Sequence, residues 1–145
     1  MILQKTYINI KDNSGFLTGQ VINTRQCKTA RIGNTIKMAI QKAKVQAKIK
    51  ASSNARNRHQ LSSGRGSLQT AMIIQTRKAL LRLDGSSLRF PSNAGVVINQ
   101  RAGKQGAQLA FKRINSAVPF ELRKKSLWQR LKGPLPLMKL AKTLI

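Results

Sequence analysis

Few side chains in this 145-residue sequence could perform acid–base or metal chemistry. The acidic residues are Asp12, Asp84 and Glu121, widely spaced along the chain, and the one histidine is His59. Paired-carboxylate catalysis, two-metal sites and acid-rich calcium loops all need more carboxylates than these. A single cysteine, Cys27, excludes an internal disulfide and any zinc site built from several cysteines. We therefore predict that the chain is not an enzyme and holds no metal or cofactor.

Basic side chains dominate the sequence instead. Lys and Arg total 28 against 3 acidic residues, which gives a formal net charge of +25 at pH 7. Three carboxylates can neutralise only a few of these cations, so most of them must face water or an external polyanion. Folded RNA presents phosphates and sugar hydroxyls that suit a cationic surface. Aromatic residues make up only 4% of the chain, which is poor for stacking the bases of single strands.

The positive charge is concentrated in two blocks. Residues 37–65 carry eight cations and no acid, and residues 101–145 carry eleven cations and one acid. Residues 66–100, which lie between these blocks, form the most apolar part of the chain. This layout predicts a compact scaffold with cationic extensions.

The scaffold itself is predicted to be mainly strand. Short apolar segments at 7–10, 71–74 and 94–98 are bounded by turn residues, and an Asp-Gly pair at 84–85 is typical of a tight hairpin. No alternation of helix and strand is visible, which argues against a parallel α/β sheet. We therefore expect a small β-barrel.

Residues 36–49 allow two interpretations. Apolar residues alternate with polar ones, and the phase of the alternation changes near residues 41–43. This pattern predicts a long strand with a bulge or bend at that point. Ile36, Ile40, Ala43 and Ala47 also fit helical spacing, so a helix is the alternative.

The last thirty residues show a helical period. Apolar side chains at Phe120, Leu127, Trp128 and Leu131 share one face of a helix, and a second apolar stripe follows at 137–145. The predicted fold class is therefore all-β with a helical tail: a barrel followed by short C-terminal helices.

One central segment carries a more specific pattern. An apolar strand ends in basic residues, a basic stretch with Asp-Gly-Ser follows, and a second apolar strand begins after Asn-Ala and ends in Asn. The matching blocks are 71–78, 82–86, 88–90 and 93–99, with shorter ones at 12–15, 32–34, 121–123 and 137–140. Together these blocks closely resemble ribosomal protein fourteen of the large subunit.

The resemblance implies both a fold and a role. The fold is a single domain over 1–145, with a five-stranded β-barrel over 1–116, a protruding basic ribbon and loop over 37–66, and a helical segment over 117–145. The implied role is a structural constituent of the large ribosomal subunit that binds its rRNA at the intersubunit face. The implied partners are large-subunit rRNA, ribosomal protein nineteen, and small-subunit rRNA across an intersubunit bridge, with no membrane and no small-molecule substrate.

The sequence departs from the family pattern in ways that suggest its location. Members of the family carry many more than three acids, and the connection at 50–66 is longer and more basic here. Loss of acids with retention of the core pattern predicts a diverged mitochondrial member, on the ribosome of the matrix.

RNA contacts are predicted from a turn, from one ribbon face, from a basic loop, from the barrel wall with its hairpin, and from the first tail helix. In that order the residues are Asn13 and Ser14; Lys42, Lys44, Lys48 and Lys50; Arg56, Arg58 and Arg65; Arg77, Lys78, Arg82 and Arg89; and Arg123, Lys124 and Lys125. The alternative for each cation is an ordinary solvated position, and Asn13 and Ser14 could simply form their turn.

The high positive charge is also compatible with two other functions. A free RNA-binding or ribosome-assembly factor would show it, and so would a cationic protein of the membrane surface, for which only 120–131 could supply an amphipathic helix.

Overall fold

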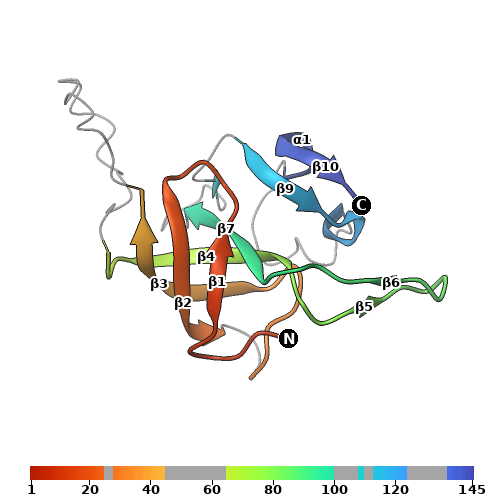
Figure 1. Cartoon of the computed structure of the whole chain (residues 1–145), viewed down its shortest axis with the longest axis horizontal. Helices are drawn as coiled ribbons and strands as arrows, with labels where there is room; N and C mark the ends of the chain where they lie inside the picture. The colour runs from red at the N-terminus through yellow and green to blue at the C-terminus, as the bar shows by residue number, and fades with distance from the viewer. Residues whose placement is uncertain (25–27, 45–64, 100–107, 110–112, 124–136) are drawn as a thin grey trace.

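Five strands form a closed β-barrel in this computed structural model, which describes residues 1–24, 28–44, 65–99, 108–109, 113–123 and 137–145 (Figure 1). The barrel strands are β1 (Tyr7–Ile10), β2 (Phe16–Thr24), β3 (Thr35–Ala43), β4 (Leu68–Gln75) and β7 (Ala94–Asn99). Sequential neighbours in this order pair antiparallel, and a parallel pairing of β1 with β7 closes the barrel. The predicted five-stranded barrel is therefore confirmed.

Alternating side chains explain why these segments are strands. On β3, Ile36, Met38 and Ile40 are completely buried while Lys37 between them is exposed. A period of two directs the apolar set into the barrel and leaves the lysine outside. The helical alternative for 36–43 is therefore wrong. The predicted bulge is present, because Thr18 pairs with Lys42 whereas the next residue, Gly19, pairs with Ile40, which leaves Gln41 as an extra residue on β3.

The strands β4 and β7 are buried on both faces. One face points into the barrel, where Ala71, Ile73 and Val97 join the interior cluster. On the other face Met72 and Ile74 join a second apolar cluster, which includes side chains from outside the barrel. A strand covered on both faces has a continuous apolar sequence instead of an alternating one, which is what 71–74 shows.

The remaining elements cover the outer face of β4 and β7 or project from the barrel. A hairpin of β5 (Leu80–Leu81) and β6 (Ser87–Leu88) extends away from it in Figure 1 and confirms the predicted Asp-Gly turn. After β7 in the sequence, the chain forms five more short elements: β8 (Gln108–Leu109), β9 (Ile114–Val118), a 3₁₀ turn η1 (Phe120–Arg123), α1 (Leu137–Leu140) and β10 (Ala141–Leu144).

The predicted helical tail is wrong for the described residues. Helical structure there is limited to the four residues of η1 and the four of α1, and the chain then continues as β10, parallel to β9. The physical reason is that β9 lies over the second apolar cluster with its backbone edge available. Pairing with β10 satisfies the polar groups of that edge, which a helix could not do. Residues 124–136, and with them most of the first predicted helix, lie outside the described residues.

Residues 37–43 also differ from expectation, since they form the wall of the barrel as part of β3 and do not protrude. The rest of the predicted ribbon and loop falls largely on residues 45–64, which lie outside the described residues. Within the described ranges, no helix is long and apolar enough to cross a membrane.

Candidate RNA-binding surface

The turn that follows β1 is fixed to the barrel by a buried carboxylate. Asp12 Oδ2 accepts a hydrogen bond from the Val97 backbone N–H at 2.8 Å, and Oδ1 accepts bonds from both the N–H and the hydroxyl of Ser14. Burial raises the pKa of Asp12 above its usual value, although the hydrogen bonds from Ser14 and Val97 act in the opposite direction. The next residue, Asn13, is thereby presented at the surface on a fixed backbone.

Basic residues from two other segments meet this turn, and Arg65 lies further along β3. The Lys44 N–H donates to the Gly15 carbonyl at 2.7 Å, and the Arg113 N–H donates to Asn13 Oδ1 at 3.2 Å. Lys42 lies opposite Thr18, just past the turn. The segment with Arg65 runs beside β3, because the N–H of Gly66 donates to the Ile40 carbonyl. Asn13, Ser14, Lys42, Lys44, Arg65 and Arg113 together are called the turn cluster below.

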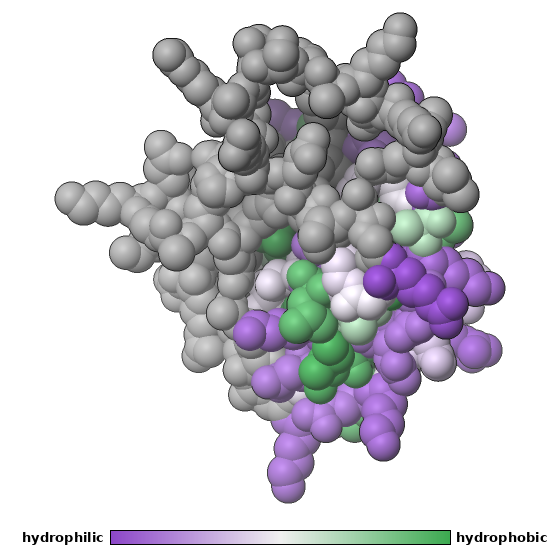
Figure 2. Space-filling view, turned by 90° about the vertical axis from the view of Figure 1, so that its left-hand side faces the viewer, coloured by the Kyte–Doolittle hydropathy of each residue, from purple (hydrophilic) through white to green (hydrophobic). Residues whose placement is uncertain are grey.

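The basic side chains of the turn cluster are exposed, and so is Asn13, whereas Ser14 is half-buried. Hydrophilic residues also cover most of the described surface on the side of the molecule where β3 lies, with one narrow hydrophobic band among them (Figure 2). The sequence placed all of these residues except Arg113 in separate predicted sites, and the barrel brings Asn13, Lys44 and Arg113 together after the end of β1.

A second group of cations surrounds the base of the β5–β6 hairpin. The Phe90 N–H donates to the Thr76 carbonyl, so that Arg77 and Arg89 flank one hydrogen bond. The Arg77 N–H is held in turn by Asn93 Oδ1 at 2.9 Å. Exposed side chains of Arg31, Arg77, Lys78 and Arg89 form this group, which is called the hairpin-base cluster below.

Arg82 has a different environment from the other predicted contacts. Its Nε donates to Glu121 Oε1 at 2.5 Å, and its Nη2 donates to the Ile145 carbonyl at 3.1 Å. The hydrogen bond that Glu121 accepts, together with its negative charge, raises the pKa of Arg82 above its usual value. The guanidinium thus joins the hairpin to η1 and to the end of β10, and its charge is already balanced.

All three acids of the sequence have structural partners. Asp12 is bound to its own turn and to β7, Glu121 is paired with Arg82, and Asp84 accepts bonds from the N–H and the hydroxyl of Ser86. Hydrogen bonds from Ser86 lower the pKa of Asp84 below its usual value. Within the described part of the chain, no ion pair joins an acid to the cations of the turn cluster or the hairpin-base cluster.

Several predicted contacts are not placed. Lys48, Lys50, Arg56, Arg58, Lys124 and Lys125 lie outside the described residues, and for Arg123 the structure gives only its backbone in η1. Among the described residues, no three His, Cys, Asp or Glu side chains lie close enough together to hold a metal ion.

Two cations were missed by the sequence reasoning. Arg113 meets Asn13 across 100 positions, and Arg31 precedes a turn that meets β4 through a bond from the Gly33 N–H to the Ile73 carbonyl. No local pattern marks either residue, because both are brought into place by long-range pairing.

A comparison with protein families agrees with this arrangement. The family model described as ribosomal protein L14p/L23e matches residues 1–132 of the 145. The match includes every strand of the barrel and both clusters of cations. The chain therefore belongs to the ribosomal protein L14p/L23e family and has a structural role in the large ribosomal subunit.

Proposed function

We propose that this chain binds large-subunit rRNA through the turn cluster and the hairpin-base cluster, and that it catalyses no reaction. The observation that carries this proposal is the absence of acid partners for either cluster among the described residues, in a chain of net charge +25. Cations without internal counter-ions gain most from an external polyanion, and binding RNA releases the counter-ions that the phosphates hold.

In the turn cluster, the backbone of the turn positions Asn13, and the exposed basic side chains supply the positive charge. The turn from Asp12 to Gly15 is anchored to β7 and β3, so Asn13 is presented in one position. Beside it, Lys42 and Lys44 supply point charges for phosphates, and Arg113 can bind two phosphate oxygens at once. Arg65, further along β3, can bind a phosphate in the same way. The cluster thus recognises the spacing of phosphates and not a base sequence.

In the hairpin-base cluster, Arg77 and Arg89 project from a paired backbone on neighbouring segments. Two guanidinium groups held by antiparallel segments suit two successive phosphates of one RNA strand. Arg82 remains a predicted contact, but we expect it to contribute less, because Glu121 already balances its charge.

The unplaced cations belong to the same proposal. Lys48, Lys50, Arg56, Arg58 and Arg123 to Lys125 would extend the basic surface into rRNA. The position on the subunit rests on the family alone: we propose the intersubunit face, with ribosomal protein nineteen as a neighbour and small-subunit rRNA across a bridge. The excess of cations over acids supports a mitochondrial member of the family.

The test is binding of the full chain to transcribed large-subunit rRNA over a range of salt concentrations. If about 6–10 phosphates are contacted, affinity falls roughly 10³–10⁵-fold between 50 and 200 mM salt. Small-subunit rRNA and an unrelated RNA of equal length serve as controls for specificity. An affinity that hardly changes with salt would contradict phosphate binding.

A further inference from the structure

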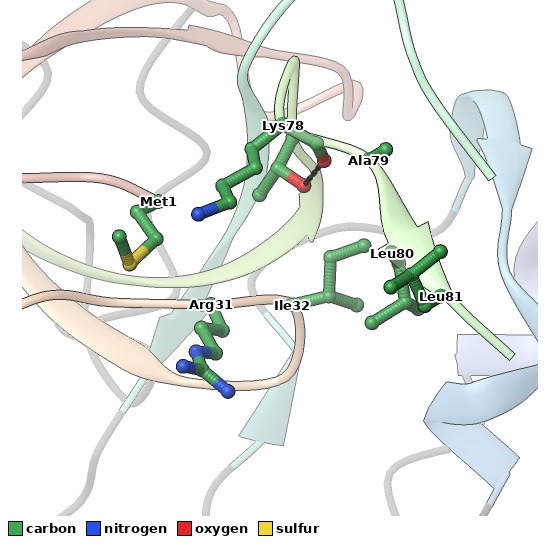
Figure 3. A pocket seen from close by; sticks show the side chains of 8 residues that line it. Met1, Arg31, Ile32, Lys78, Ala79, Leu80 and Leu81 are labelled. Atoms are coloured by element: carbon green, nitrogen blue, oxygen red, sulfur yellow. Dashed lines mark hydrogen bonds between the residues drawn. The ribbon is translucent and has the colours of Figure 1, made fainter. Parts of the chain in front are cut away.

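A cavity of about 270 Å³ opens at the base of the β5–β6 hairpin (Figure 3). Its walls come from the first residue of the chain, the turn before β3, the segment between β4 and β5, and β5 itself. Apolar side chains of Ile32, Leu80 and Leu81 line one part of it, and the side chains of Arg31 and Lys78 lie on the other side in Figure 3.

The cavity is preformed by anchored backbone. The Gly33 N–H donates to the Ile73 carbonyl at 2.8 Å, which holds the turn that carries Arg31 and Ile32 against β4. On the opposite wall the Thr76 hydroxyl donates to the Lys78 carbonyl at 2.9 Å. A ligand would therefore not have to order either wall, which lowers the entropic cost of binding.

The charge around the cavity is entirely positive. None of its described lining residues is acidic, and the three acids of the sequence are engaged with Val97, Ser86 and Arg82 as described above. Arg31 and Lys78 therefore have no acid partner within the described residues. An occupant should thus combine a flat or compact apolar group with an adjacent anion.

We propose that this cavity binds one unpaired nucleotide of large-subunit rRNA, with its base against Ile32, Leu80 and Leu81 and its phosphate on Arg31 and Lys78. The inference rests on the proposed function and adds a defined site to it. A volume below the 300–1,000 Å³ typical of drug-sized ligands suits a single base. Proteins read RNA mostly at unpaired nucleotides, whose bases are free to leave the stack. Here Ile32, Leu80 and Leu81 offer apolar surface to bury the face of one base, while Arg31 and Lys78 remain for its phosphate.

Photo-cross-linking in assembled ribosomes tests the site directly. Leu81→p-benzoylphenylalanine places a reactive group at a side chain that is 78% exposed and borders the cavity. Leu83→p-benzoylphenylalanine is the matched control, because Leu83 is fully exposed on the same hairpin but does not line the cavity. We expect the reagent at position 81 to cross-link to one rRNA nucleotide, and the reagent at position 83 not to reach that nucleotide.

Three outcomes separate this inference from the proposed function. A cross-link from position 81 to protein only, or no cross-link in large subunits that contain the chain, overturns the cavity proposal and leaves rRNA binding intact. Absence of the unmodified chain from large subunits contradicts the proposed function itself, and the cavity proposal with it.

Substitutions at the cavity give a second readout. Ala79→Trp adds a bulky side chain at an exposed residue of the cavity lining, and Arg31→Gln with Lys78→Gln removes the two cations. Ala79→Trp should weaken binding to an rRNA fragment that contains the cross-linked nucleotide about tenfold, the loss expected when roughly 55 Å² of apolar contact returns to water. Removing the two cations should weaken binding more at low salt than at high salt. Lys139→Gln with Lys142→Gln removes the same charge at exposed tail positions and should have a smaller effect.

The role of the base is isolated by making that nucleotide abasic. The wild-type chain should bind the abasic fragment about tenfold more weakly, because the apolar contact of the base is lost, and Ala79→Trp should cause no further loss on it. Additive losses would show that the substitution acts elsewhere, and would overturn the proposal.

Discussion

Arg82 and Glu121 form an ion pair of 2.5 Å that joins the β5–β6 hairpin to η1, 39 positions further along the chain. A second bond from Arg82 reaches the Ile145 carbonyl, so one guanidinium holds three segments together. Arg82, the one half-buried side chain among the predicted RNA-contact cations whose exposure the structure describes, thus helps to position the hairpin. It also fixes the wall of the cavity that Leu80 and Leu81 line.

The first prediction concerns this pair. Glu121→Gln should lower the Tm by a small amount, and Arg82→Gln by somewhat more, because it also removes the bond to the Ile145 carbonyl. The double substitution should lower the Tm little further than Arg82→Gln alone, because both changes remove the same ion pair. Thermal unfolding in high-salt buffer measures all three variants, with Arg89→Gln as an exposed control on the same hairpin. Independent, additive losses would show that the two residues do not act as a pair.

The second prediction concerns the turn cluster. Lys42→Gln with Lys44→Gln should reduce the magnitude of the salt slope for rRNA binding by about 1.4–1.8, the value for two lost phosphate contacts. The fold should be unaffected, because both side chains are exposed. Titration at several salt concentrations measures the slope, with Lys139→Gln and Lys142→Gln as the charge-matched control. An unchanged slope would remove these lysines from the RNA-binding surface.

The third prediction concerns the buried carboxylate of Asp12. Its pKa is raised by burial, so the folded state binds the proton more tightly than the unfolded chain does. The stability that this titration contributes is fully present below the unfolded pKa, about 3.9, and is lost as the pH rises through the higher folded pKa. The Asp12→Asn variant should not lose stability over this pH range, because its side chain does not titrate.

Urea unfolding of both proteins at a series of pH values above about 4 measures the effect. The stability of the wild type relative to Asp12→Asn should decrease as the pH rises and then become constant. Asp84 offers a contrast of opposite sign, because its pKa is lowered and its contribution is lost as the pH falls. A relative stability that increases with pH at Asp12 would contradict the prediction.

The fourth prediction concerns the closure of the barrel, where β1 meets β7 at Gly95. A Cβ at Gly95 would lie 3.0 Å from the Met72 carbonyl oxygen, whereas a Cβ at Gly19 would meet the flexible side chain of Met38 at 2.7 Å. Because backbone cannot move as easily as a thioether, Gly95→Ala should cost about 1–3 kcal/mol and Gly19→Ala less. Equal losses in urea unfolding would show that the barrel adapts at both positions.

Local patterns were sufficient for the barrel but not for the tail. Alternation over 36–40, the apolar runs at 71–74 and 94–98 and the Asp-Gly turn each predicted an element that the structure contains. The stripe at 137–145 has helical spacing, yet β10 forms there because β9 offers an edge for pairing. Local sequence patterns around 137–145 cannot reveal this strand pairing, because Ala141 pairs with Ile114, 27 positions earlier.

The candidate site shows the same division between local and long-range information. Charge counts led to the hypothesis of a polyanionic ligand, and turn residues predicted the turn at 12–15 that the structure contains. The meeting of Lys44 and Arg113 with that turn depends on long-range pairing in the barrel, which periodicity does not reveal. The ion pair between Arg82 and Glu121 could not be predicted from the sequence either, because only folding brings these positions together.

Sedimentation of the tagged full chain through a sucrose gradient tests the central claim most directly. With magnesium present, we predict that the chain migrates with intact ribosomes, and after chelation of magnesium with the large subunit alone. The variant that lacks Lys42 and Lys44 should dissociate from the large subunit at lower salt than the wild type does. Migration at the top of the gradient, or with small RNA particles only, would contradict the account and indicate a free RNA-binding or assembly factor.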